Sequence, residues 1–297
     1  MADVVILSES EWQARRDVHA GRVRPWIEPR LRRMSLGERH PVEDFLFEYY
    51  AYRPGQLLRW HAGLGFALEK GGEYLSHKGY AETEQGVAAV PATLPAGRLA
   101  SIRWLRAMLE RTEARAPALG CFGLHEWAMV YRAETVRHES WPLRLTPEAI
   151  ARVVEEHGPR CTHYDAFRFF TPAARPLNKF QPGRDTTAEF EQPGCLHANM
   201  DLYKWAFKLS PFASSELVAD CFALAREIRV LDMRASPYDF STLGLSPVRI
   251  ETPEGRAEYE AGQREFARLA APLRRKLADL CGNILAAAPA PTDTVPA

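Results

Sequence analysis

The stretch from Pro193 to Pro211 constrains the fold more than any other part of the sequence, because it predicts a buried helix. Pro-Gly at its start and Ser-Pro at its end disfavour helix, so a helix of about three to four turns fits between them. Apolar residues cover most of its circumference, which is typical of a helix inside a protein core. At about 3.6 residues per turn, one polar stripe remains, which consists of His197, Asp201, Lys204 and Lys208.

This stripe is the first candidate for a functional site. A His and an Asp one helical turn apart can bind the same metal ion, or the carboxylate can orient the imidazole. The sequence offers similar pairs at His125-Glu126, in a short apolar helix, and around His163 and Asp165. Imidazoles and carboxylates from neighbouring helices can hold iron or another transition metal and leave positions open for a substrate. We therefore predict metal ligands at His197, Asp201 and His163, and catalytic groups at His125, Glu126, Asp165 and Tyr203.

Two other interpretations of the same residues stay open. A single helical His can be the axial ligand of a haem, with its second ring nitrogen fixed by an acceptor such as Asp201. Alternatively, these side chains are hydrogen-bonded polar groups of a helical core, without any ligand. The sequence contains no HExxH pair, so it gives no support to a zinc protease.

A second group of polar residues surrounds the predicted central helix. Cationic side chains there can receive a carboxylate or a phosphate of a ligand, although each can also belong to a solvated face. The predicted substrate-binding residues are Arg168, Lys204, Arg234 and Asp239.

The remaining chain predicts a mainly α-helical fold. Helical periodicity dominates and no alternation of strands and helices is present, so we expect a single-domain helical bundle over residues 1–285. An irregular excursion that contains Gly and Tyr interrupts it near residues 63–95. The Ala- and Pro-rich tail, residues 286–297, is predicted to be disordered.

Charge and cysteine content narrow the class of protein. The chain has 38 basic and 38 acidic side chains, whereas proteins that grip DNA phosphates usually carry a basic excess, so nucleic acid is a possible but less favoured partner. The five cysteines are widely spaced, which disfavours a disulfide framework. No signal peptide and no long apolar run is present, so we expect a cytoplasmic protein without a membrane segment.

Five blocks of the sequence resemble a bacterial family commonly labelled 3-methyladenine DNA glycosylase, and the resemblance runs from Trp12 to the last helix. These blocks are residues 39–46, 120–131, 165–178, 193–211 and 215–239. The resemblance implies base-excision DNA repair by an N-glycosylase, which stacks a flipped base between aromatic rings and supplies a carboxylate. The residues that would serve are Glu126, Asp165 and Asp201 as carboxylates, and Trp127, Tyr164, Phe169 and Trp205 for stacking.

The length, the helical content and the His197-Asp201 pair are also similar to histidine-ligated haem-dependent aromatic hydroxylases. That similarity implies an oxidoreductase with His197 as axial ligand and His163 or His125 as the distal group. The first functional hypothesis is thus a metal- or haem-dependent enzyme that acts on a small aromatic or carboxylate-bearing molecule. A DNA glycosylase and a non-catalytic helical binding protein are the alternatives.

Overall fold

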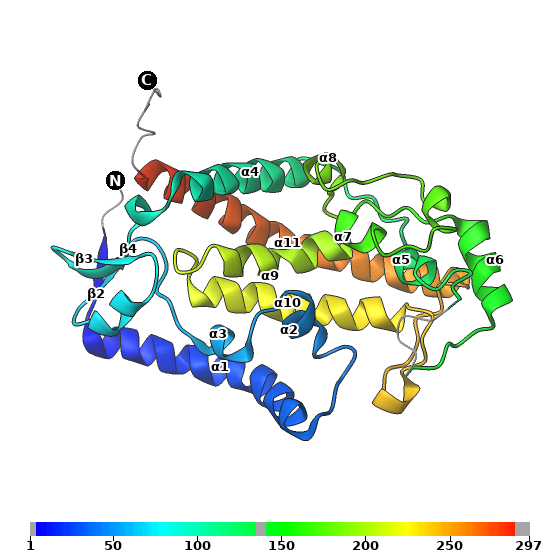
Figure 1. The fold of residues 1–297 in the computed structure, drawn as a ribbon, viewed down its shortest axis with the longest axis horizontal. Coiled ribbons are helices and arrows are strands. Elements are labelled where there is room, and N and C mark those ends of the chain that lie inside the picture. Colours follow the sequence, from blue (N-terminus) through cyan, green and yellow to red (C-terminus); the bar gives the residue numbers. More distant parts are fainter. Residues whose placement is uncertain (1–3, 135–140, 289–297) are drawn as a thin grey trace. The chain divides into compact units, whose positions relative to one another are not determined.

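The fold is that of a computed structural model, which describes residues 4–134 and 141–288 of the 297-residue chain. The chain is mainly helical, as predicted: helices account for 58% of it, with eleven α-helices and one four-stranded sheet in the described residues. The five long helices are α1 (Glu9–Leu36), α4 (Ala96–Glu113), α9 (Leu196–Lys208), α10 (Ser215–Arg234) and α11 (Pro253–Ala287) (Figure 1). The short helices are α2 (Phe45–Tyr49), α3 (Pro54–Leu58), α5 (Leu124–Ala128), α6 (Pro147–His157), α7 (Tyr164–Phe167) and α8 (Thr187–Phe190).

Contacts between residues divide the chain into two compact units. The first unit contains residues 1–109, 202–223 and 273–297, and the second contains residues 110–201 and 224–272. The helices α9, α10 and α11 contribute residues to both units. The number of domains therefore stays a prediction, whereas the helical class is confirmed.

A small mixed sheet occupies part of the predicted irregular excursion in the first unit. Its strands are β1 (Val5–Leu7), β2 (Phe66–Leu68), β3 (Tyr80–Thr83) and β4 (Gly86–Ala89), in the order β1-β2-β4-β3. β1 pairs with β2 in parallel, and the other pairs are antiparallel. The tight turn between β3 and β4 ends at Gly86, whose φ of 122° disfavours any residue with a side chain.

The sequence from Ser8 to Glu11 has the pattern of a capping box and predicts a helix through about Val23. The helix α1 begins there and continues much further. The Ser8 amide donates to the Glu11 carboxylate at 2.8 Å, which completes the predicted capping box. The prediction ended this helix near Val23, but it passes Pro25 and Pro29 and ends at Gly37, which adopts the left-handed conformation. A proline costs a helix one hydrogen bond, and this loss is tolerated here because Val23 and Ile27 anchor the helix in the core.

Aromatic side chains form much of the core of the first unit. The rings of Trp12 and Trp60 both pack edge-on against Tyr74, with centroid distances of 5.7 and 6.3 Å. The Tyr203 ring of α9 packs against the Phe222 ring of α10 at 4.9 Å, which joins these two helices.

The second unit is built from short helices and connecting segments around the first turns of α9, the last turns of α10 and the first part of α11. Thr146-Pro147-Glu148 is typical of a helix start, and the Thr146 side chain does cap α6. The Trp127 indole is fully buried and donates to the carbonyl of Ala235 at 2.8 Å, which fixes α5 to the end of α10.

The predicted disordered tail, residues 286–297, begins inside the last helix. Ala286 and Ala287 belong to the last turn of α11, and residues 289–297 of the predicted tail lie outside the described residues. No helix in the described ranges is both long and apolar enough to cross a membrane.

Candidate metal centre

Three buried side chains from three helices converge in the second unit. They are His125 of α5, His197 of α9 and Asp232 of α10, and one potential ligand atom from each lies within 4.8 Å of the other two. Their exposed fractions are 4%, 9% and 0%. Two imidazoles and one carboxylate form a donor set that suits a transition-metal ion.

The distances within this group also suit metal coordination. The His125 Nε2 atom lies 3.0 Å from the Asp232 Oδ1 atom, a distance that fits a hydrogen bond and also fits two ligand atoms of one ion. Two ligand atoms at about 2.1 Å from one ion, at right angles, lie about 3 Å apart. The rings of His125 and His197 are perpendicular, with centroids 4.5 Å apart. The three potential ligand atoms are therefore close enough to share one ion.

Local sequence explains why His125 reaches this point. Gly123 precedes α5 with a φ of 71°, a conformation that side chains rarely adopt. A Cβ atom at this position would lie 3.2 Å from the Tyr259 ring and 3.3 Å from the Ala235 methyl group. Gly123 therefore allows both the sharp turn and the close approach of α5 to its neighbours.

A buried ion-pair network supports the carboxylate. The Arg229 guanidinium donates to Asp232 Oδ2 at 2.8 Å and to Glu126 Oε1 at 3.3 Å. Arg229 is only 3% exposed, and Glu126 is 5% exposed. Because isolated buried charges are costly, each of these groups depends on the others. Arg229 thus fixes one Asp232 oxygen while the other faces His125.

A second group of polar side chains lies beside the first. The His163 Nδ1 atom is 3.1 Å from Glu191 Oε1, and its Nε2 atom is 3.8 Å from Asp201 Oδ2. The His163 ring is roughly parallel to that of His197, with centroids 5.4 Å apart. His163, Asp165 and Asp201 also place one potential ligand atom each within 4.8 Å of one another. The second unit therefore holds an unusual density of buried imidazoles and carboxylates.

Burial and charge set the protonation states. Burial lowers the pKa of His197 well below its ordinary value, and the neighbouring His125 adds to this effect. Burial also opposes protonation of His125, but the nearby Asp232 raises the pKa of His125 above the ordinary value. In turn, burial disfavours ionisation of Asp232, but His125 and Arg229 lower the pKa of Asp232 overall. A neutral His197 and an ionised Asp232 are the forms that bind metals.

A very small cavity adjoins this group. Its volume is about 10 Å³, and its wall includes His125, His197, Tyr259 and Arg160. Three cysteines also line it: Cys121, Cys161 and Cys195. About 10–15 Å³ is the space that one water molecule needs. The cavity suits an ion with a small ligand, and a porphyrin does not fit it.

The predicted metal ligands are brought together in part. His197 and His163 are neighbours, as predicted, and His125 and Glu126 lie in the same buried group. Asp201, however, groups with His163 and Asp165 rather than with His197. Asp201 lies one turn after His197 on the same helix, but its carboxylate is 3.8 Å from the His163 Nε2 atom and belongs to that second group.

Tyr203 does not belong to this group. Its ring lies in the first unit among Tyr50, Tyr52 and Phe222, and its side chain is fully buried. The expectation of a catalytic Tyr203 is therefore not supported by its position.

The four predicted substrate-binding residues have other partners. Arg168 is exposed and pairs with Asp165 at 3.2 Å, and the Lys204 ammonium lies 4.3 Å from the centroid of the Trp205 ring. Arg234 donates to the Ser246 carbonyl at 2.7 Å, and the Asp239 carboxylate accepts from the Ser241 amide at 2.8 Å. None of the four lines the small cavity in the described structure.

Sequence reasoning missed Asp232, Arg229 and Glu191. Arg229 and Asp232 are three residues apart on α10, a spacing that indicates an ion pair, but nothing in the local sequence indicates that this pair is buried. Glu191 lies in a connecting segment, where nothing in the local sequence indicates burial.

Comparison of the chain with protein-family models, with curated proteins and with solved structures finds no match.

Proposed function

We propose that this protein is a metal-dependent enzyme in which His125, His197 and Asp232 hold one transition-metal ion. The observation that carries the proposal is the convergence of these three buried side chains, from three separate helices, within 4.8 Å. The His125 Nε2 and Asp232 Oδ1 atoms are 3.0 Å apart, a distance that fits two ligand atoms of one ion. A metal ion satisfies both atoms at once.

Iron(II) is the ion that this donor set favours, because two His and one carboxylate leave coordination positions open. When bound, iron(II) would supply oxidation chemistry at these open positions. The protein's own contribution is to hold His197 neutral, to fix Asp232 through Arg229 and to exclude water from the site.

The proposed substrate is a small carboxylate-bearing molecule, and Arg160 supports this choice. Arg160 is exposed and lines the cavity, and no ion pair engages it within the described ranges. Its guanidinium is suited to a carboxylate. Because the cavity itself is so small, the substrate enters only if the Arg160 side chain or the adjacent segment moves.

The DNA glycosylase hypothesis has less support from the geometry. Glu126 and Asp201 are 5% and 1% exposed, and the cavity beside the buried group is too small for a purine. Release of 3-methyladenine from methylated DNA tests this hypothesis directly. A reconstituted protein without bound metal would favour the non-catalytic role.

The deciding experiment is metal analysis of the full chain, purified without oxygen and reconstituted with iron(II). We expect about one equivalent of iron, and less than about a tenth of an equivalent in the variants His125→Ala, His197→Ala and Asp232→Asn. Nitric oxide added to the iron(II) protein should give the electron paramagnetic resonance signal of a high-spin iron–nitrosyl species.

His157→Ala is the matched control, because His157 lies in the same unit and contacts Arg256 at 3.1 Å instead of the buried group. This variant should keep its iron. Circular dichroism verifies that each variant folds. A folded native protein that binds no iron, zinc or manganese after reconstitution would rule out the proposed centre.

A further inference from the structure

The first unit contains a second, larger cavity that the proposed metal centre does not explain. Its volume is about 370 Å³, which lies within the range of about 300–1,000 Å³ typical of small-molecule sites. The wall is formed by the end of α3 and the residues after it, by the end of the turn at Gly72–Ser76 and the residues after it, and by the end of α9, the start of α10 and their connection. His125, His197 and Asp232 do not contribute to it.

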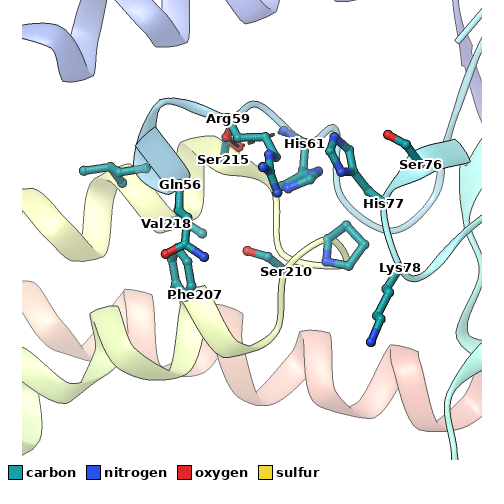
Figure 2. A pocket seen from close by; sticks show the side chains of 12 residues that line it. Gln56, Arg59, His61, Ser76, His77, Lys78, Phe207, Ser210, Ser215 and Val218 are labelled. Carbon is teal, nitrogen blue, oxygen red and sulfur yellow. Dashed lines mark hydrogen bonds between the residues drawn. The ribbon is translucent and has the colours of Figure 1, made fainter. Parts of the chain in front are cut away.

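The charged side chains of this cavity are all cationic or imidazole groups. Arg59, His61, His77 and Lys78 line it, and none of the lining residues among those described is an Asp or a Glu. Figure 2 shows Arg59, His61 and His77 gathered along one wall, with Ser210 facing them. Within the described structure no ion pair engages Arg59 or Lys78. The chain as a whole has equal numbers of acidic and basic residues, so this cavity is more positive than the average of the chain.

The nearest carboxylates are committed elsewhere. Glu216 accepts a hydrogen bond from the Trp60 indole at 2.9 Å, and Glu73 pairs with Arg16 at 3.1 Å. Burial lowers the pKa of His61 to about 3, and the positive charges of His77 and Arg59 contribute to this shift. Lowered pKa values keep His61 and His77 neutral near pH 7, so Arg59 and Lys78 supply the positive charge, and no carboxylate is among the described lining residues.

The wall that carries these groups is held in place. The His61 amide donates to the Ser215 hydroxyl at 2.8 Å, and the Ser215 amide donates back to the His61 carbonyl at 3.0 Å. The Ser215 hydroxyl also donates to the Arg59 carbonyl at 3.2 Å. The His61 Nδ1 atom lies 3.1 Å from the Tyr80 hydroxyl. This part of the cavity is thus preorganised, which reduces the entropic cost of binding.

Donor number and cavity size define the ligand. A guanidinium, an ammonium, imidazoles and the hydroxyl of Ser210 exceed what the two oxygens of a carboxylate use, whereas a phosphate offers three terminal oxygens. The volume is also too large for an ion alone, and Phe207 and Val218 add apolar surface. We propose that this cavity binds a small phosphate monoester, with the phosphate against Arg59, His77 and Lys78 and the apolar part against Phe207.

The test is calorimetric titration of the full chain with phenyl phosphate, inorganic phosphate and benzoate at pH 7.5. We expect phenyl phosphate to bind most tightly, because it alone offers both the dianion and the apolar part. Arg59→Gln and Lys78→Gln should each weaken its binding about tenfold, because each removes a charge-assisted contact. Both side chains are exposed, so the variants should fold.

Two controls separate this site from other sources of phosphate binding. Arg39→Gln removes an exposed arginine outside the cavity and should leave the affinity unchanged. Asp232→Asn, which disables the proposed metal centre, should also bind phenyl phosphate normally. Failure of the metal proposal is therefore distinguishable from failure of this one.

Four results would overturn the proposal. They are no binding of phenyl phosphate at about 10 mM, binding that both Arg59→Gln and Lys78→Gln leave unchanged, benzoate binding as tight as that of phenyl phosphate, and inorganic phosphate binding as tight as that of phenyl phosphate. The third result would exclude a phosphate-specific site, and the fourth would exclude a contribution from the apolar wall.

Discussion

At the scale of single residues, burial decides what the histidines can do. His197 stays neutral because the surrounding core disfavours its charged form, while Asp232 favours the charged form of His125. The same residue type thus has opposite preferences at two adjacent positions. Asp232, which lies far from both in the sequence, outweighs burial at His125 but not at His197.

His61 gives a prediction of pH dependence. Its pKa is lowered from 6.5 to about 3 in the folded chain, so between these values the unfolded chain binds the additional proton. The folded state is therefore most stable, as far as His61 is concerned, above pH 6.5, and it loses stability as the pH falls towards 3. This one group contributes a slope of up to about 1.4 kcal/mol per pH unit to the free energy of unfolding.

Urea unfolding between pH 4.5 and 7.5 (about the titration range of His61) measures this slope. His61→Asn should reduce the slope of the unfolding free energy against pH by the contribution of about one proton. Tyr80→Phe removes the hydroxyl that contacts His61 but keeps the titrating ring, so its slope should match that of the native protein. An unchanged slope in His61→Asn would contradict the assignment.

At the scale of elements, one carboxylate joins α1 to the start of α2. Asp44 accepts from Arg30 at 2.7 Å, from Arg33 at 2.6 and 3.0 Å, and from the His40 amide at 2.8 Å. It is 1% exposed. Although burial opposes its ionisation, the hydrogen bonds from Arg33 and His40 lower the pKa of Asp44 overall.

Asp44→Asn should therefore lower the free energy of unfolding by about 3–5 kcal/mol, because it leaves two arginines without their buried counter-ion. Glu43→Gln is the matched control: Glu43 also pairs with Arg33, at 2.9 Å, but its side chain is 44% exposed. Glu43→Gln should lower the free energy of unfolding by less than about 1 kcal/mol. Chemical denaturation of both variants makes the comparison, and equal losses would contradict the role given to Asp44.

The elements also show which local signals suffice for prediction. The helix-breaking pairs at Pro193 and Pro211 and the capping residues Ser8 and Thr146 mark helix ends correctly, because these effects act within one turn. The strands of three or four residues between Phe66 and Ala89 are too short to show an alternating pattern. Their pairing depends on partners that a local pattern does not reveal.

At the scale of the whole molecule, the candidate site was predictable only in part. The apolar surroundings of His197 and the short helix of His125 indicate burial, and both residues do lie in the buried group. Asp232 was not predicted, because its partners His125 and His197 are distant in the sequence and only the packing of α10 brings the three residues together. The cationic cavity was also not predicted, since its lining residues come from three separate parts of the chain.

The distribution of the cysteines has an experimental consequence. No disulfide joins them; Cys221 and Cys281 are buried in the first unit, and Cys161 and Cys195 are buried in the second. A thiol-alkylating reagent reaches such side chains only through transient opening of the surrounding structure. The modification rate of each cysteine, followed by peptide mass spectrometry, therefore gives a separate opening free energy for each unit without any introduced label. Addition of iron(II) should slow alkylation of Cys161 and Cys195, because a ligand that binds the closed form suppresses opening.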